Sequence, residues 1–158
     1  MPLPEDLRRA NDVFAAQFAE GGLERPPRRR LAILTCMDAR IDPVRLFGLE
    51  VGDAHVLRNA GARATDDVVR SLVVAQRLLS VEQVLVLGHT DCGLEGVSND
   101  ELRDRVGADA AEIDFAPFAD VDAGVRETVS QLRADARLAG AAVAGAVYDV
   151  RTGRVYEP

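Results

Sequence analysis

Two short apolar runs, at residues 31–34 and 84–88, constrain the fold of this chain most strongly, because each leads directly into a polar loop. Residues 65–80 lie between them and show a helical pattern, with Thr65 as the N-cap and two aspartates in the first turn. Strand, loop, helix and strand in this order predict a βαβ unit, whose two strands run parallel. Polar side chains that follow neighbouring parallel strands meet at one edge of the sheet, where α/β proteins bind their ligands.

The remaining segments extend this unit on both sides. Apolar periodicity predicts one helix over residues 4–20 and another over residues 121–140, each ended by glycine. Short apolar runs and turn residues predict five strands and two short helices. The strands are expected at 30–35, 54–58, 83–88, 141–150 and 154–156, and the short helices at 43–47 and 101–106.

We therefore expect an α/β fold in a single domain over residues 1–158. A central, mostly parallel β-sheet is flanked by helices, and the strand after the Thr152-Gly153 turn forms an antiparallel C-terminal edge. The division expected within the domain is an N-terminal helical arm at 1–24 and an α/β core at 28–158.

The composition argues against several classes of protein. The chain has 158 residues and a net charge of -7, and an acidic chain is a poor partner for the phosphates of nucleic acids. Its one basic cluster, at residues 25–30, is broken by two prolines and is interpreted as a solvated linker. No stretch has the roughly 18 uncharged apolar residues of a membrane span, and the first residues do not resemble a secretory signal. We expect a cytoplasmic protein that binds neither nucleic acid nor membrane.

The two polar loops contain the residues for a zinc site. Cys36 follows the first apolar run, and His89 and Cys92 follow the second with His-x-x-Cys spacing. Two thiolates and one imidazole suit catalytic zinc, which takes three protein ligands and leaves a fourth position open. A phosphatase loop would need arginine where Asp42 stands, and no Cys-x-x-Cys redox pair is present. A nucleophilic cysteine–histidine dyad is conceivable but leaves Cys92 unexplained, and each cysteine taken alone could be a buried core residue.

The pair of motifs Cys-x-Asp-x-Arg at residues 36–40 and His-x-x-Cys at residues 89–92 resembles the signature of the β-class carbonic anhydrases. Residues 52–61 and the helix that begins at Thr65 also resemble this family, and the short chain is most similar to its compact prokaryotic branch. The resemblance implies a parallel sheet with an antiparallel addition. It also implies a homodimer or a dimer of dimers, with the active site near the subunit interface and the N-terminal helix reaching over the partner.

The resemblance also implies roles for five residues. Cys36, His89 and Cys92 would bind Zn²⁺, and Asp38 and Arg40 would form a dyad beside it. In some members of the family the aspartate becomes a fourth metal ligand and displaces water. Two thiolates cancel the charge of zinc, so the pKa of its bound water should lie above the value of about 7 reached with three histidines. An ionised Asp38, held by Arg40, could compensate by accepting a hydrogen bond from the zinc-bound hydroxide.

Other polar or flexible residues are weaker candidates. His55 is a candidate proton shuttle, with packing in its strand as the alternative. Asn59, Gly61 and Gly93 are candidates to line the substrate cleft, the first two through backbone groups. Asp91 is interpreted as a loop or interface carboxylate rather than a ligand.

The function expected from these observations is the zinc-dependent, reversible hydration of carbon dioxide to bicarbonate. A hydrolase of carbonyl sulfide or carbon disulfide is the first alternative, because those enzymes share the fold and the ligands of the resembled family. A non-catalytic zinc-binding protein is the second alternative, although structural zinc sites prefer four closed ligands.

Overall fold

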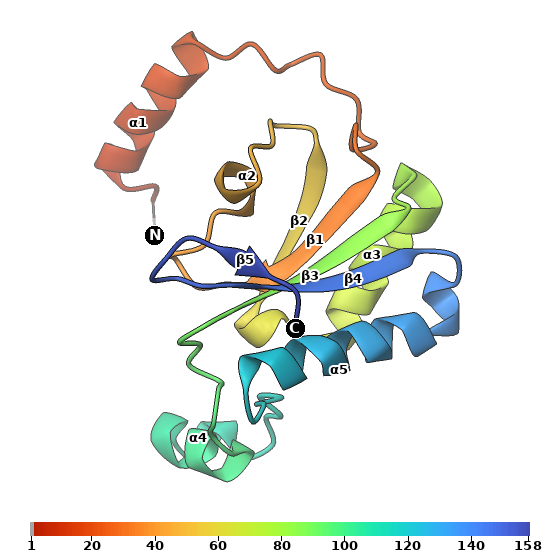
Figure 1. The fold of residues 1–158 in the computed structure, drawn as a ribbon. Coiled ribbons are helices and arrows are strands. Elements are labelled where there is room, and N and C mark those ends of the chain that lie inside the picture. Colours follow the sequence, from red (N-terminus) through yellow and green to blue (C-terminus); the bar gives the residue numbers. More distant parts are fainter. Residues whose placement is uncertain (1) are drawn as a thin grey trace.

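The computed structural model describes residues 2–158 and has one five-stranded sheet in the order β2-β1-β3-β4-β5 (Figure 1). The strands are β1 (Leu31–Cys36), β2 (Ala54–Asn59), β3 (Gln83–His89), β4 (Ala142–Tyr148) and β5 (Val155–Tyr156). The helices are α1 (Glu5–Ala16), α2 (Pro43–Leu46), α3 (Asp66–Leu79), α4 (Asn99–Val106) and α5 (Val121–Ala134), with 3₁₀ turns η1 (Ala60–Ala62), η2 (Ala108–Ala110) and η3 (Ala136–Leu138). The first four strands run parallel and β5 is antiparallel to β4, which confirms the predicted fold class.

The register of the central strands determines where the polar loops meet. β1 pairs with β2 on one side and β3 on the other, with Thr35 opposite Leu87 and Cys36 opposite Asn59. Because β1 has neighbours on both sides and is buried along almost its whole length, it forms the centre of the core. The loops after β1, β2 and β3 therefore leave the sheet at the same edge.

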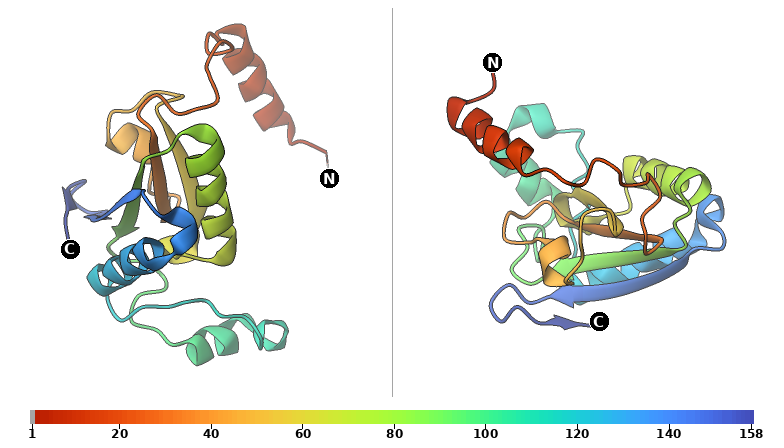
Figure 2. Two further views of the ribbon diagram at one scale, coloured as in Figure 1. Left: turned by 90° about the vertical axis from the view of Figure 1, so that its right-hand side faces the viewer. Right: turned by 90° about the horizontal axis from the view of Figure 1, so that it is seen from above.

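Helices α3 and α5 cover the sheet, as Figure 2 shows. α3 begins at the predicted N-cap, where the hydroxyl of Thr65 accepts the N–H of Val68. α5 packs against β3 and β4, and one glycine of each strand faces it. A Cβ atom at Gly88 would lie 2.5 Å from Val125, and one at Gly145 would lie 2.6 Å from the same side chain. These two glycines allow the helix to lie directly against the strands.

Helix α1 stands away from the sheet in Figures 1 and 2. It ends at Ala16, four residues before the predicted end, because the following N–H groups of Gln17 and Phe18 bond to carbonyls three residues back. None of its residues is buried. Its large apolar side chains are exposed, namely Leu7, Val13 and Phe14, together with Phe18 after its end.

Two other helices, α4 and α5, differ from their predicted ranges by two residues or more at one end. α4 begins earlier than predicted because Ser98 and Glu101 form a capping box around its first turn. α5 ends at Ala134 rather than at Gly140, because the carboxylate of Asp135 accepts the N–H of Arg137 and starts η3. Both differences come from side-chain caps, which act more locally than apolar periodicity does.

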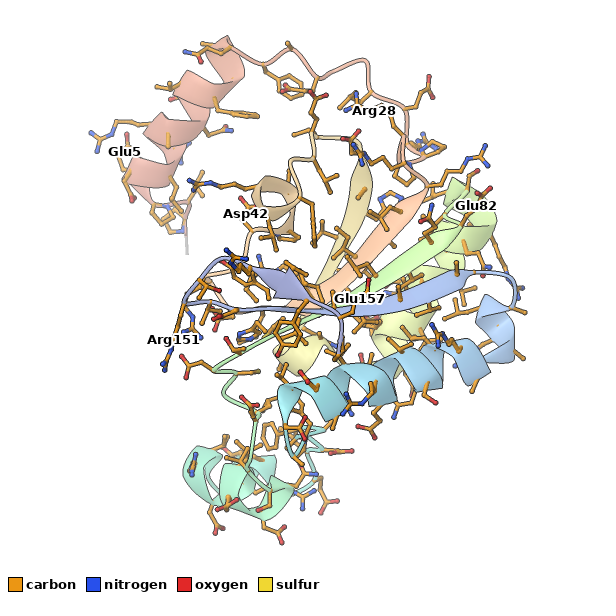
Figure 3. All side chains as sticks on the ribbon, viewed as in Figure 1. Glu5, Arg28, Asp42, Glu82, Arg151 and Glu157 are labelled. Atoms are coloured by element: carbon orange, nitrogen blue, oxygen red, sulfur yellow. The ribbon has the colours of Figure 1, made fainter. Side chains whose placement is uncertain are left out.

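Three arginines of the linker between α1 and β1 pair with carboxylates, namely Arg28, Arg29 and Arg30. Nε of Arg28 lies 2.8 Å from Oδ1 of Asp53, and its Nη2 lies 3.1 Å from Glu50. Arg30 pairs with Glu82, and Figure 3 places Arg28 and Glu82 at the end of the sheet where the parallel strands begin. These arginines are exposed and paired, which agrees with the interpretation of a solvated linker.

Candidate metal centre

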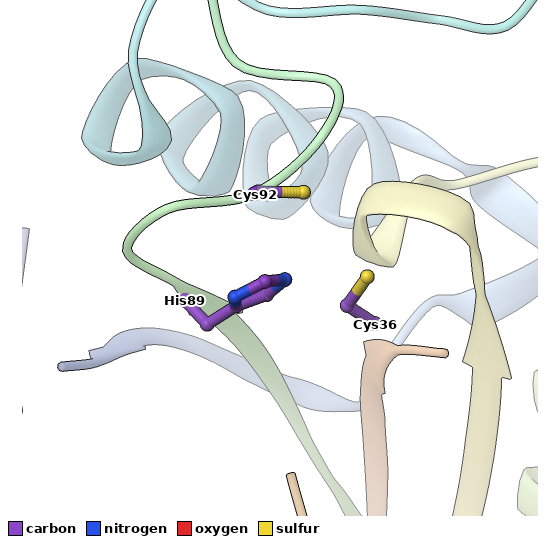
Figure 4. A group of neighbouring side chains, drawn as sticks. All are labelled: Cys36, His89 and Cys92. Atoms are coloured by element: carbon purple, nitrogen blue, oxygen red, sulfur yellow. The ribbon is translucent and has the colours of Figure 1, made fainter. Parts of the chain in front are cut away.

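Three side chains with metal-binding atoms converge at the carboxyl edge of the sheet (Figure 4). Cys36 is the last residue of β1, His89 is the last residue of β3, and Cys92 lies in the loop that follows. Their ligand atoms all lie within 4.8 Å of one another, and all three residues are buried. The parallel pairing of β1 with β3 therefore brings together the cysteine–histidine cluster, as we name these three residues.

The hydrogen bond of His89 shows which ring nitrogen is free. Nδ1 lies 3.0 Å from the carbonyl oxygen of Thr90, and a carbonyl only accepts, so Nδ1 carries the hydrogen. Nε2 is then an acceptor, and it is buried with no hydrogen-bond partner among residues 2–158. A buried polar atom without a partner is costly, whereas a metal ligand with its other nitrogen bonded in this way is common. The cluster therefore fits zinc.

The two thiols of the cluster influence each other's ionisation. The hydrogen bond from Cys92 holds the pKa of Cys36 well below its usual value, and the N–H of Gly61 adds to this effect. The same interaction with Cys36 raises the pKa of Cys92. One proton between two sulfur atoms thus favours a single thiolate, and a divalent cation in its place would stabilise both.

Arg40 holds the carboxylate of Asp38 on both oxygens. Its Nε donates to Oδ1 at 3.0 Å and its Nη2 donates to Oδ2 at 2.8 Å, while its backbone N–H donates to Oδ1 at 2.8 Å. These bonds hold the pKa of Asp38 well below its usual range, so the group is ionised at neutral pH. Asp38 lies outside the cysteine–histidine cluster in this arrangement, and direct binding to the metal stays a prediction.

Two contacts of this region were not predicted from the sequence. Arg40 also donates from Nη1 to Oδ2 of Asp91 at 2.8 Å and from Nη2 to its carbonyl oxygen at 3.0 Å. Asp91 is thus the second carboxylate partner of Arg40. Arg58 donates from Nε to the carbonyl of Cys36 at 3.0 Å and from Nη2 to that of Asp38 at 2.6 Å. The place of Asp91 inside the His-x-x-Cys loop was the only sequence signal for either contact.

The three candidate cleft residues lie beside the cluster in different settings. The carbonyl of Asn59 accepts the N–H of Met37 at 2.9 Å, and the N–H of Gly61 donates to Sγ of Cys36 at 3.4 Å. These backbone groups therefore contact the strand end that holds the ligand. Gly93 is exposed, with open space where a Cβ would lie. A role of the three in the substrate cleft stays a prediction.

His55 lies far from the cluster along its strand. It stands opposite Ala32 in the register, whereas Asn59 stands opposite Cys36. Four residues of strand span about 13 Å, which is too far for direct proton transfer within one subunit. Its Nε2 is buried without a partner among the described residues. Both the packing role and the shuttle role of His55 stay predictions.

A cavity of about 370 Å³ opens beside the dyad and gives small molecules room to approach it. Its walls come from the loop after β1, from α2 and from the end of β4. The lining residues are Arg40, Asp42, Arg45, Leu46 and Tyr148. Among residues 2–158 no helix has the length and apolar character needed to cross a membrane; the cytoplasmic location stays a prediction.

The fold and the cluster together define an α/β protein with a zinc site at the carboxyl ends of neighbouring strands. A family model described as carbonic anhydrase matches residues 31–114. Beta-carbonic anhydrase 1 of Mycobacterium tuberculosis (strain ATCC 25618 / H37Rv) is 38% identical over 153 residues, covering 94% of this chain and 93% of that protein. The chain belongs to the β-class carbonic anhydrase family, which confirms the resemblance seen in the motifs.

Two further similarities bear on the function. The crystal structure of carbonic anhydrase from Streptococcus mutans has a TM-score of 0.90 at 39% identity, and the match covers 99% of each chain. Carbon disulfide hydrolase of Saccharolobus solfataricus (strain ATCC 35092 / DSM 1617 / JCM 11322 / P2) is 42% identical over 98 residues. That match covers 62% of this chain and 46% of the hydrolase.

Proposed function

We propose that this protein catalyses the reversible hydration of carbon dioxide to bicarbonate, with Zn²⁺ held by Cys36, His89 and Cys92. The observation that supports this most is the unpartnered Nε2 of His89 between two cysteines, next to a carboxylate kept ionised by an arginine. Membership of the carbonic anhydrase family and the full-length similarity to Beta-carbonic anhydrase 1 agree with it.

The residues of the site then have separate tasks. Zinc, when bound, would lower the pKa of water and so supply hydroxide as the nucleophile. Asp38 would accept a hydrogen bond from that nucleophile and orient it, because its ionised carboxylate has acceptor capacity beyond its bonds to Arg40. Arg40 fixes the carboxylate through two parallel bonds, which is the strongest geometry for such a pair.

Hydrolysis of carbon disulfide or carbonyl sulfide is the second candidate, because a carbon disulfide hydrolase shares 42% identity over part of the chain. The similarity to the carbonic anhydrases extends over more of both partners, and it favours carbon dioxide. The test compares initial rates for carbon dioxide, carbonyl sulfide and carbon disulfide on one zinc-loaded preparation. We expect carbon dioxide to react fastest; faster release of hydrogen sulfide from either sulfur compound would overturn the assignment.

We also propose that the functional unit is a homodimer or a dimer of dimers. The exposed apolar residues Leu7 and Phe14 on α1, and Phe18 after it, would be covered by a partner subunit. Light scattering of the full chain should give at least about twice its mass of 17.0 kDa. Replacing Leu7 and Phe14 by serine should shift the mass toward the monomer, whereas replacing the exposed Arg9 on the same helix should not. An active monomeric wild type would contradict the proposal.

A further inference from the structure

A buried arginine lies behind the cluster and has no part in the proposed reaction. Arg63 is 5% exposed, although burial of a guanidinium is costly unless it is paired. Its Nη1 donates to the carbonyl of Gly124 at 2.8 Å and to the hydroxyl of Thr128 at 3.0 Å, both on α5, and its Nη2 pairs with Glu127. The guanidinium carbon also lies 5.8 Å from the centre of the Phe118 ring. Arg63 therefore fixes the chain after β2 to α5.

Two further hydrogen bonds close the 59–63 turn, which consists of residues 59 to 63. The side-chain amide of Asn59 donates to the carbonyl of Arg63 at 2.7 Å and accepts its N–H at 2.9 Å. Inside the turn, Gly61 has φ 76° and Ala62 has φ 56°. Alanine rarely adopts that left-handed conformation, so the surrounding contacts must maintain it.

The 59–63 turn supplies one hydrogen bond to a proposed metal ligand. Figure 4 shows η1 beside Cys36, where the N–H of Gly61 lies 3.4 Å from Sγ. The other side of Gly61 is closed, since a Cβ there would lie 2.9 Å from Leu94 and 3.2 Å from Phe118. The N–H is thus aimed at the sulfur by contacts on both sides. An N–H···S bond withdraws electron density from a thiolate and leaves more positive charge on its metal.

We propose that Arg63 and Asn59 are positioning residues for the zinc ligand Cys36. They hold the 59–63 turn so that the amide of Gly61 donates to the Cys36 sulfur. This bond offsets part of the charge that two thiolates give to zinc. It also stabilises the Cys36 thiolate against protonation and holds it in position, which strengthens zinc binding. The inference rests on the proposed zinc site, but it concerns the electronic state of one ligand rather than the identity of the substrate.

The test uses Arg63→Met, which keeps an apolar stem of similar size and loses every hydrogen bond of the guanidinium. Asn59→Ala opens the same turn from the other side, so the inference remains testable if one variant fails to fold. Leu72→Ala serves as the control, because it removes a buried side chain of α3 that belongs to the general core. Zinc affinity is measured by competition with a chelator, and cobalt(II) is loaded for electronic absorption spectra.

We expect both turn variants to bind zinc about 10- to 100-fold more weakly, with the thiolate-to-cobalt absorption band at longer wavelength than in wild type. The double variant should lose little more than either single one, because both act through one turn. An unchanged band in a folded turn variant, or an equal shift in Leu72→Ala, would overturn the inference. If the wild type binds no zinc, the proposed function fails instead, so the two failures are distinguishable.

Discussion

Nη1 of Arg40 lies 2.8 Å from Oδ2 of Asp91, and this ion pair joins the loop after β1 to the loop after β3. Arg40 therefore contacts two carboxylates at once, because Asp38 occupies the other side of its guanidinium. The position of the dyad thus depends on the loop that also supplies His89 and Cys92. A substitution in that loop should therefore alter the position of Asp38 through Arg40, even where no metal ligand is replaced.

The first prediction concerns Asp91. Its backbone has a φ of 60°, a conformation that both glycine and asparagine tolerate. Asp91→Gly removes the side-chain partner of Arg40 and should lower the hydration rate severalfold, while Asp91→Asn keeps an acceptor and should stay closer to wild type. Both side chains of the pair are more than a third exposed and screened by solvent, so the free energy of unfolding should change little. Stopped-flow rates and urea unfolding measure the two effects. Equal rates in wild type and Asp91→Gly would show that the pair has no influence on the dyad.

The second prediction concerns Arg40→Ala across the pH range of activity. Without Arg40 the pKa of Asp38 should return toward about 3.9, so the carboxylate is still ionised from about pH 7 to about pH 9. The variant should nevertheless lose at least about tenfold in rate at every pH in this range, because the carboxylate is no longer oriented and becomes free to bind the metal. Arg45→Ala, which lines the same cavity outside the dyad, is the matched control. A profile for Arg40→Ala that overlays the wild type would exclude the dyad from the reaction.

The third prediction is a pH-dependent contribution of Asp53 to stability. The backbone N–H of Glu50 and the guanidinium of Arg28 hold the pKa of Asp53 below its usual value. A lowered pKa in the folded state stabilises the fold above the unfolded pKa of about 3.9, and this is lost as pH falls through the folded pKa. Asp53→Asn should therefore unfold at lower urea than wild type near neutral pH, and the difference should shrink on acidification. A difference that is constant with pH would contradict this linkage.

The fourth prediction compares two leucines of α3. Leu72 is 1% exposed and packs in the core, whereas Leu78 on the same helix is 74% exposed. Leu72→Ala should lower the free energy of unfolding by about 2–5 kcal/mol through lost contacts and the cavity left behind. Leu78→Ala should change it by about 0.5 kcal/mol or less. Urea unfolding of both variants measures the contrast, and similar losses would mean that the helix does not pack as described.

The sequence predicted those parts of the fold that depend on local patterns. The apolar runs at β1 and β3 and the N-cap at Thr65 were enough to predict two parallel strands joined by a helix. The predicted ends of α1 and α5 were wrong, because the ends of these helices depend on the hydrogen bonds of single residues such as Asp135. Glycine after a helix indicates that the helix has ended, but it does not fix where.

For the site, the motifs predicted the cluster because its three residues lie at or near strand ends. The contacts of Arg63 with α5 could not be predicted, since they join side chains more than 60 positions apart. The pair between Arg40 and Asp91 spans 51 positions and could not be predicted for the same reason. Periodicity and spacing describe neighbours along the chain, and only the folded sheet brings these groups together.

The most direct test of the account is stopped-flow hydration of carbon dioxide while metal-free protein is titrated with zinc. The account predicts that the rate rises with added zinc and levels off at about one equivalent per chain, as a single three-ligand site requires. Cys36→Ala should bind little zinc and remain nearly inactive over the same titration. A wild type that binds one zinc per chain without hydrating carbon dioxide would contradict the central claim, as would full activity in Cys36→Ala.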